Sequence, residues 1–476
     1  MPIFQQKKQN FPLKIVGSTV FGRYPKISKE ETFNMIISDG WLVPYAGYKK
    51  ITDILPNGES RGLFYSVPLN KLIIVIDNEI YFVSTNENFE LRATIDSYVG
   101  DVFIDENDAG QIAICDKKDI YILDYKNNVF QKAETSGSQP LDFLPVYITF
   151  QNGYFISADS KSPQWRLSEL NNGLVFPAEA AYVGTFQSKP DLPKAAIRIP
   201  GKGNQLFVIG STVTELWTDV GYDLFPYQRT TAFNIDYGCI NQSTIAASDN
   251  FIIWLGINEK SGPTIIYSSG GSVKQISNDG INFKLAQLTA PEDSYGFLFK
   301  QDGHLIYQLT FKTDNLTYIF DFNTNAFFTL SDENANHHIA KRVAYFNNKY
   351  YFISFDDGNL YEMNSIYTDY DGKEIPRTRI CPNIRLPDSS PFIVNSIGFP
   401  LEQGKGKQKQ VIDLSISNDG GEMFGNTRRS ELRSLGNRKN RYKEWGLGRT
   451  NDFVPKFKFW GFDRVVASDG VVEVYR

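Results

Sequence analysis

The chain has 476 residues, enough for two or three domains with complete cores, and its 41% hydrophobic content excludes an intrinsically disordered protein. Its formal net charge of −5 excludes a surface that attracts nucleic acid everywhere. Its three cysteines are far apart, which excludes a disulfide framework and a zinc-ligand spacing and predicts reduced thiols, as expected for assembly in cytoplasm.

Residues 1–54 are predicted to form an extended arm with the strands that lead into the first domain. Met1 to Asn10 is polar and has no apolar segment, so we expect no signal peptide. The longest aliphatic run near the start, Leu72 to Ile76, is much too short to cross a bilayer. We therefore expect no membrane insertion.

Residues 55–365 contain a loose repeat with a period of about 40–50 residues, which is the length of one four-stranded propeller blade. Each unit has short apolar or alternating strands, rich in aromatic residues and separated by Asn, Asp, Gly and Ser. One such sheet cannot bury both faces alone, so successive sheets are expected to pack against one another around an axis. The pattern predicts an all-β fold with a β-propeller of six or seven blades. The units begin near residues 62, 101, 146, 196, 243, 295 and 342.

An insertion separates the third and fourth units. It runs from Pro163 to Pro193, and we expect it to form a loop that reaches a neighbouring molecule.

Residues 366–476 have a different texture. A segment rich in Asp, Pro and Arg comes first, and alternating strands follow, among them residues 411–417, 457–461 and 471–475. Alternation of this kind predicts one buried and one open sheet face. We predict a β-sandwich-like domain that serves as a platform or interface.

The C-terminal part is basic, whereas the rest of the chain is acidic. Between Lys405 and Arg464 there are 14 Lys and Arg residues and 7 Asp and Glu residues, a net charge of +7, so the remainder carries −12. Three interpretations stand: salt bridges to an acidic neighbouring subunit, which we favour, contact with DNA in a channel, and a solvated loop. The candidate interface residues are Arg428, Arg429, Arg433, Arg438, Arg441, Lys443, Trp445 and Arg449.

Residues typical of catalysis are scarce. The only histidines are His304, expected at a turn or rim, and the adjacent His337 and His338, expected in a polar loop. The sequence has no Gly-x-Ser-x-Gly elbow and no complete phosphate-binding or calcium loop. We therefore predict no catalytic residues, no cofactor and no metal site, although paired carboxylates could meet in a propeller without being close in sequence.

Several ordered motifs carry a resemblance. They are Gly58-Glu59-Ser60-Arg61-Gly62, the strand Thr212 to Trp217, the Ser417-Asn418-Asp419-Gly420 turn and the Arg438–Arg449 stretch around Trp445. In this order they resemble the packaged-DNA stabilisation protein of short-tailed bacteriophages, also called tail accessory factor or tail hub, a nozzle-type protein.

This resemblance implies a non-enzymatic structural protein of the virion tail. It implies a homo-hexameric ring below the portal and adaptor rings that closes the channel, retains the packaged DNA without sequence specificity, and carries a needle or plug and tailspikes. No cofactor is implied. Two alternatives remain: a propeller enzyme acting on cell-surface glycans, and a protein-binding propeller scaffold in a cell.

Overall fold

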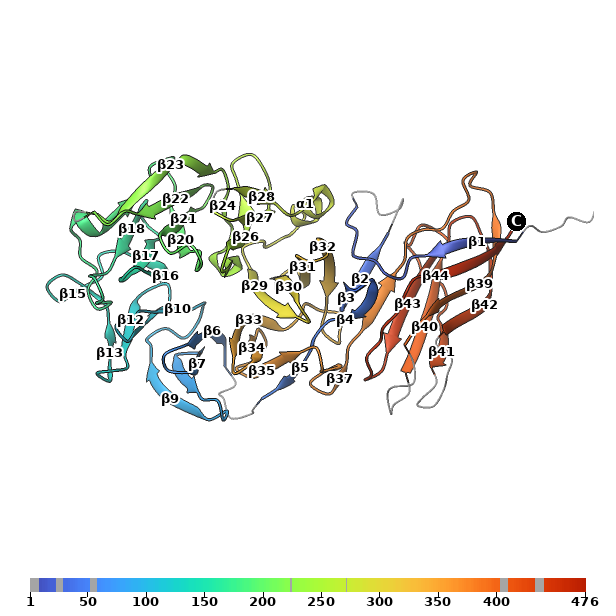
Figure 1. Ribbon diagram of the computed structural model, residues 1–476, viewed down its shortest axis with the longest axis horizontal. Helices are drawn as coiled ribbons and strands as arrows, with labels where there is room; N and C mark the ends of the chain where they lie inside the picture. The colour runs from blue at the N-terminus through green and yellow to red at the C-terminus, as the bar shows by residue number, and fades with distance from the viewer. Residues whose placement is uncertain are drawn as a thin grey trace, which may run out of the picture.

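The computed structural model describes residues 8–22, 29–51, 58–222, 225–270, 272–402, 410–432 and 441–476. The molecule is elongated, with a ring of small sheets at one end and a two-sheet sandwich at the other (Figure 1). The predicted all-β fold class is confirmed, since one short α-helix, α1 (Asp279–Leu285), is the only one in the part of the chain that the structure describes.

Seven antiparallel sheets form the propeller within these described ranges, and we number them blade one to blade seven in chain order. Blade one consists of β6 (Ser60–Ser66), β7 (Lys71–Ile76), β8 (Glu79–Val83) and β9 (Phe89–Thr94). Blade two consists of β10 (Phe103–Glu106), β11 (Gln111–Cys115), β12 (Ile120–Asp124) and β13 (Val129–Lys132). Blade three consists of β16 (Pro145–Gln151), β17 (Tyr154–Asp159), β18 (Gln164–Leu167) and β19 (Val183–Thr185).

Blades four to seven complete the circle. Blade four consists of β20 (Pro193–Arg198), β21 (Gln205–Gly210), β22 (Thr214–Asp219) and β23 (Tyr227–Ile235), and blade five of β24 (Gly238–Cys239), β25 (Ala246–Ser248), β26 (Phe251–Ile257), β27 (Thr264–Ser268) and β28 (Val273–Gln275). Blade six consists of β29 (Ser294–Gln301), β30 (His304–Phe311), β31 (Leu316–Asp321) and β32 (Ala326–Leu330). Blade seven consists of β33 (Ala340–Phe346), β34 (Lys349–Ser354), β35 (Leu360–Asn364) and β5 (Gly47–Lys50).

The blades form where the sequence repeat predicts them. The middle strands β7 and β11 are buried almost throughout, because each lies between two neighbouring blades. Tight turns such as Asn152-Gly153 and Asp302-Gly303 join the first two strands of blades three and six. Both residues of each turn have positive φ, which Asn, Asp and Gly tolerate and which matches the twist of a hairpin.

Ring closure depends on a strand from the N-terminal segment. β5 pairs antiparallel with β35 and supplies the fourth strand of blade seven. The chain then enters blade one, so a strand that precedes the first blade in sequence completes the last blade.

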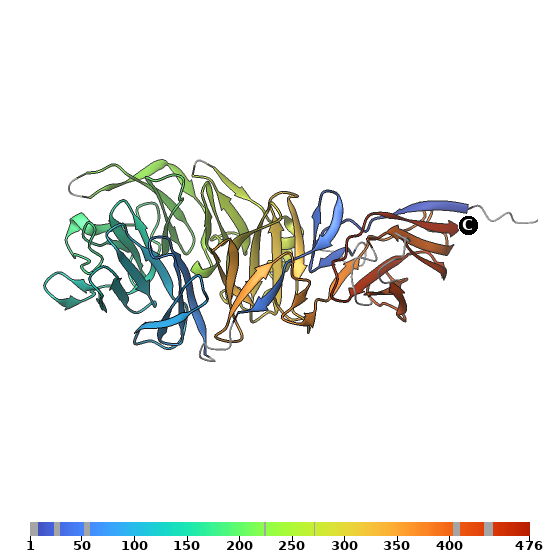
Figure 2. The same ribbon diagram turned by 60° about the horizontal axis from the view of Figure 1, so that its bottom comes forward.

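The sandwich consists of two sheets around one core. One sheet has the order β1 (Lys8–Leu13), β44 (Gly470–Tyr475), β39 (Phe392–Pro400) and β42 (Arg441–Thr450). The other contains β2 (Glu31–Phe33), β38 (Arg377–Ile380), β43 (Val454–Trp460), β40 (Gln410–Ser417) and β41 (Arg428–Leu432). Apolar side chains of both sheets, including Val394, Phe399, Leu414 and Phe457, pack together between them. Figure 2 shows β1, in blue, beside the red C-terminal strands.

One continuous sheet connects the propeller with the sandwich. β2 pairs with β38 of the sandwich on one side and, through Phe33 and Thr329, with β32 of blade six on the other. The hairpin of β3 (Met35–Ser38) and β4 (Trp41–Pro44) reinforces this junction, since Met35 contributes to the sandwich core and Ile36 to the propeller core.

Residues 8–50 therefore contribute strands to the sandwich, the junction and blade seven. The predicted domain limits at residues 54 and 365 stay a prediction.

We expected the insertion from Pro163 to Pro193 to be a loop that reaches a neighbouring molecule, but much of it belongs to the propeller itself. It contains β18 and β19, the outer half of blade three. Between them Phe176 is fully buried in the core shared by blades two and three, because its segment hydrogen-bonds to Glu134. The remaining short elements are β14 (Glu134–Thr135), β15 (Gln139–Pro140), β36 (Asp369–Tyr370), β37 (Lys373–Glu374) and the 3₁₀ turns η1 (Ala180–Tyr182) and η2 (Gln242–Thr244).

Candidate interaction surface

The predicted basic segment lies on two edge strands of the sandwich. Arg428 and Arg429 belong to β41, and Arg441, Lys443, Trp445 and Arg449 belong to β42. Arg433 and Arg438 lie outside the described residues. These strands come from different sheets, β41 from the sheet that continues into blade six and β42 from the outer sheet.

The two arginines of β41 are engaged within the chain. Arg428 donates hydrogen bonds to the carbonyl oxygens of Trp445 and Gly446, 2.9 and 2.8 Å away, and so connects the edges of the two sheets. Arg429 binds both carboxylate oxygens of Asp413 at 2.8 Å, and Trp460 Nε1 donates to the same carboxylate. The Arg429 guanidinium, followed by the Trp460 bond, holds the pKa of Asp413 below its usual range.

Four exposed residues of β42 point outward, namely Arg441, Lys443, Trp445 and Arg449, whereas Tyr442 between them is buried in the sandwich core. Their partners in the register are Pro400 for Arg441, Gly398 for Lys443, Ser396 for Trp445 and Ile393 for Arg449. Directly paired residues share one face of a sheet. Among the described residues neither Arg441 nor Arg449 has an ion pair, whereas Lys443 Nζ lies 3.6 Å from the centroid of the Trp445 ring.

Tertiary pairing extends this face across four strands. On β44 the same register places Val471, Glu473 and Tyr475 beside β39, and on β1 it places Pro12, Asn10 and Lys8 beside them. Trp445, Val471 and Ile393 are 55%, 43% and 40% exposed. We call this set the outer sheet face: Lys8, Asn10, Pro12, Ile393, Ser396, Gly398, Pro400, Arg441, Lys443, Trp445, Arg449, Val471, Glu473 and Tyr475.

Sequence reasoning missed the members of the outer sheet face that are remote from the basic segment. A signal existed in β44, where Val472 and Val474 are buried and Val471, Glu473 and Tyr475 alternate with them. Lys8 gave no such signal, because nothing near it in the sequence predicts pairing with residue 475.

The centre of the propeller is filled by charged and polar side chains at one end. Asp101, which precedes blade two, accepts a hydrogen bond of 2.8 Å from Ser243 of blade five. Its other oxygen lies 3.3 Å from Lys341 Nζ of blade seven, and Lys341 also donates to the Ser60 carbonyl oxygen of blade one. Asp101 and Lys341 are only 5% and 4% exposed. These contacts cross the axis, so the blades meet there.

Asp101 remains ionised in this network. Burial by itself raises the pKa of its carboxyl group, but Lys341, Arg342 and Lys117 outweigh burial and hold the pKa below its usual range. Asp105 differs, since burial raises its pKa above the usual range. Its carboxylate accepts hydrogen bonds from Phe150 N and Thr149 Oγ1 of blade three, at 2.7 and 3.1 Å. Both acids thus join neighbouring or opposite blades. A glycan-cleaving propeller enzyme would instead need acids gathered in an open funnel, so this arrangement does not favour that alternative.

The histidines have packing roles. Burial, followed by the influence of His337, lowers the pKa of His338 to about 3, and its ring packs against Tyr45, Tyr48 and Tyr370. His338 is thus a core residue and not part of an open loop. In the described ranges no group of three or more His, Cys, Asp or Glu side chains is placed to hold a metal ion.

His304 forms a hydrogen-bonded line with Ser38 and Asp321. Its Nδ1 lies 2.9 Å from Asp321 Oδ2, and its Nε2 lies 3.1 Å from Ser38 Oγ. Asp321 is fully buried and also accepts hydrogen bonds from the turn residues Asn323 and Thr324. The line therefore joins the β3–β4 hairpin to a turn of blade six, and we assign it this structural role.

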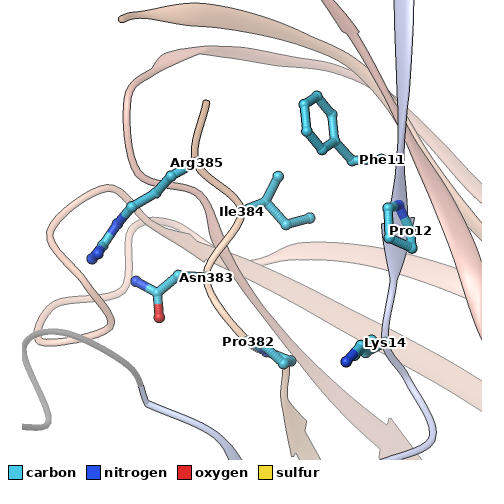
Figure 3. Close-up of a pocket in the computed structure, with 7 residues that line it drawn as sticks. All are labelled: Phe11, Pro12, Lys14, Pro382, Asn383, Ile384 and Arg385. Atoms are coloured by element: carbon cyan, nitrogen blue, oxygen red, sulfur yellow. The ribbon is translucent and has the colours of Figure 1, made fainter. Parts of the chain in front are cut away.

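A pocket of about 250 Å³ lies between β1 and the segment that follows β38 (Figure 3). Its polar side chains do not converge on the cavity, since Asn383 and Arg385 both bind Asp452 at 2.8 and 2.6 Å. Apolar groups supply most of the remaining lining. The lining residues are Phe11, Pro12, Lys14, Pro382, Asn383, Ile384 and Arg385.

The seven blades and the two packed sheets of the described residues make up a β-propeller with an appended β-sandwich, which carries the outer sheet face. Through the described part of the chain, no helix is both long and apolar enough for a membrane span. The chain belongs to the family described as "Bacteriophage P22 Gp10, beta-propeller", whose sequence model matches residues 22–367. It is therefore a β-propeller protein of a phage structural family, and the suspected relation to packaged-DNA stabilisation proteins is confirmed.

Comparison with curated proteins finds no significant match. Among solved structures, the chain is similar to a streptogramin B lyase (15% identity, 69% of this chain and 99% of that chain covered, TM-score 0.45). It is also similar to virginiamycin B lyase from Staphylococcus aureus (13% identity, 67% of this chain and 98% of that chain covered, TM-score 0.45). A third similar structure is the N-terminal domain of Nup159 (12% identity, 73% of this chain and 99% of that chain covered, TM-score 0.41). Because each TM-score lies below 0.5, no function is assigned to this chain from these similarities.

Proposed function

We propose that the chain is a structural subunit of a ring that closes the portal channel of a short-tailed phage, as a tail hub or nozzle. The family match carries this proposal, since it covers the whole propeller. Each subunit presents the outer sheet face at one end of an elongated molecule, which suits contacts within an assembly. The ring is a homo-hexamer that retains the packaged DNA without reading its sequence.

The same proposal assigns the partners. The ring joins the adaptor below the portal and holds the tail needle or plug and the tailspikes, and the subunit performs no catalysis. Assembly takes place in the host cytoplasm before the protein becomes part of the virion tail. The three cysteines support this location, because they are buried free thiols and form no disulfide.

Sedimentation of the purified chain, alone and with a portal–adaptor complex, tests the proposal. We expect a monomer in isolation and a ring on the template, since obligate tail contacts form only when a preceding ring presents its surface. Failure of the chain to join the template would overturn the assignment.

A further inference from the structure

The outer sheet face combines an apolar centre with a basic rim. Trp445, Ile393 and Val471 are the exposed apolar members, and Lys8, Arg441, Lys443 and Arg449 are the cations. The one carboxylate on the face, Glu473, is paired with Lys8 at 2.6 Å. Exposed Trp and Arg side chains around an apolar centre are typical of protein interfaces.

This face is directed away from the rest of the molecule. The inner sides of the two sandwich sheets meet in the common core, and the other sheet is the one that continues into blade six. The outer sheet face therefore lies at the end of the molecule opposite the propeller (Figure 1). Within the described residues no segment of the same chain covers it.

The composition of the face favours a protein partner over DNA. Phosphate binding needs cations but no apolar centre, and base stacking needs an open aromatic ring. Lys443 covers one side of the Trp445 ring, with its Nζ 3.6 Å from the ring centroid, which leaves less of that ring for a base to stack on. Arg441 and Arg449, which lack ion pairs in the described structure, match carboxylate groups of a partner.

The propeller carries carboxylates that match this face. Outside the basic C-terminal stretch the chain has a net charge of −12. A hollow of about 370 Å³ next to blade seven is lined by Asp332, Glu333, Asp356, Asp357 and Asp371, and by one cation, Lys373. Lys373 is already bound to Glu333 at 2.5 Å. Asp356 is exposed and, among the described residues, has no ion pair.

We propose that the outer sheet face docks on the propeller of a second copy of this chain, with Arg441 and Arg449 against Asp356 and Asp371. Donor and acceptor surfaces differ, so the contact is head to tail and closes into a ring when its rotation permits. That the chain forms a ring rests on the proposed function. The inference adds that the outer sheet face of one copy meets the propeller of the next.

A charge exchange tests this pairing. The face variant carries Arg441→Glu and Arg449→Glu, and the acceptor variant carries Asp356→Lys and Asp371→Asn. Asn is chosen because residue 371 has a φ of +50°, which Asn tolerates. On the portal–adaptor template we expect each variant alone to form at least about tenfold less ring, since a loss of about 1.4 kcal/mol changes an equilibrium tenfold.

A 1:1 mixture of the two variants is expected to regain ring formation, because each contact between alternating copies again brings opposite charges together at residue 356. The control is Lys118→Glu with Lys274→Glu, which reverses two exposed lysines of the propeller and is expected to assemble normally. An inactive mixture would overturn the pairing, while wild-type assembly on the template would leave the proposed function intact.

Cross-linking supplies a readout that does not depend on the ring. Mixed copies labelled with ¹⁴N and ¹⁵N are treated at high concentration with a carbodiimide, which joins an amine to a carboxylate in contact. We expect links from Lys443 to propeller carboxylates of the other isotope. Links confined to one copy would contradict the inference.

Discussion

Asp101 is a buried charge whose partners come from blades two, five and seven. Ser243, Lys341 and Lys117 surround its carboxylate, and the Lys341 ammonium in turn reaches the Ser60 carbonyl oxygen. A buried ion pair is weak evidence of net stabilisation, but removal of one partner leaves an uncompensated charge. The network therefore makes the relative position of the blades sensitive to a single residue.

We expect Asp101→Asn to lower the free energy of unfolding by about 3 kcal/mol. The amide keeps an acceptor for Ser243 but leaves the Lys341 ammonium without its carboxylate. Urea unfolding at neutral pH measures the change. Asp108→Asn, at an exposed position of the same blade, serves as the control and is expected to change stability by less than about 0.5 kcal/mol.

The same variant gives a prediction for pH. Because the folded-state pKa of Asp101 is lowered, its contribution is complete above about pH 4 and is lost as the pH falls through the lowered value. The wild-type protein should therefore lose more stability than Asp101→Asn between about pH 4 and pH 2. Identical acid profiles of the two proteins would contradict the role given to this carboxylate.

At the scale of single elements, β5 decides whether the propeller is closed. It has only four residues, and it is held by side chains as much as by its backbone pairing with β35. The Tyr48 ring stacks on Tyr370 at 4.5 Å and meets Phe352 and Tyr361 edge to face. Such aromatic contacts stabilise a strand that is too short to pair firmly by itself.

Tyr48→Ala should cost about 3–5 kcal/mol, since it removes a buried aromatic ring from the closing blade. Hydrogen exchange of the β5 and β35 amides is the sharper measurement, because opening of blade seven exposes these amides first. Tyr345→Ala, on the same blade but half exposed, is the matched comparison and should leave that exchange nearly unchanged. Equal protection in both variants would show that closure does not depend on Tyr48.

The whole molecule differs between its two ends in both charge and shape. The basic outer sheet face lies at one end and the acidic propeller at the other, and the sheet through β2 connects the two parts by hydrogen bonds. This hydrogen-bonded connection sets the angle between the two surfaces. In an assembly that angle sets whether repeated contacts close into a ring.

We expect the triple change of Arg438, Arg441 and Arg449 to Glu to impair ring assembly about tenfold or more while shifting the monomer melting temperature little. Arg441 and Arg449 are exposed and have no ion pair among the described residues, so their reversal breaks no ion pair there. Sedimentation on the template and thermal melting are the two measurements.

Arg428→Glu with Arg429→Glu provides the contrast. These side chains hold the two sandwich edges and Asp413, so this pair should lower the melting temperature of the monomer itself. Parallel losses of assembly and melting temperature in the triple variant would contradict an interface role for that end of the molecule.

Much of this architecture could be predicted from local patterns. Strand and turn residues recur at blade length because every blade buries the same kind of surface, so runs such as Lys71 to Ile76 and turns such as Asn152-Gly153 reveal the propeller. The excess of Arg and Lys after residue 405 likewise indicated the basic end. The family resemblance rested on other local motifs, such as Gly58 to Gly62 and Thr212 to Trp217.

Residue types and their spacing were enough to predict the fold class, the approximate blades and the basic segment. Long-range packing, by contrast, closes blade seven with β5, joins β1 to β44, and places Lys8 and Ile393 on one face with Trp445. It also brings Asp101 to Lys341 across the axis. These contacts join residues tens to hundreds of positions apart, and local periodicity carries no information about which distant strands or charges pair.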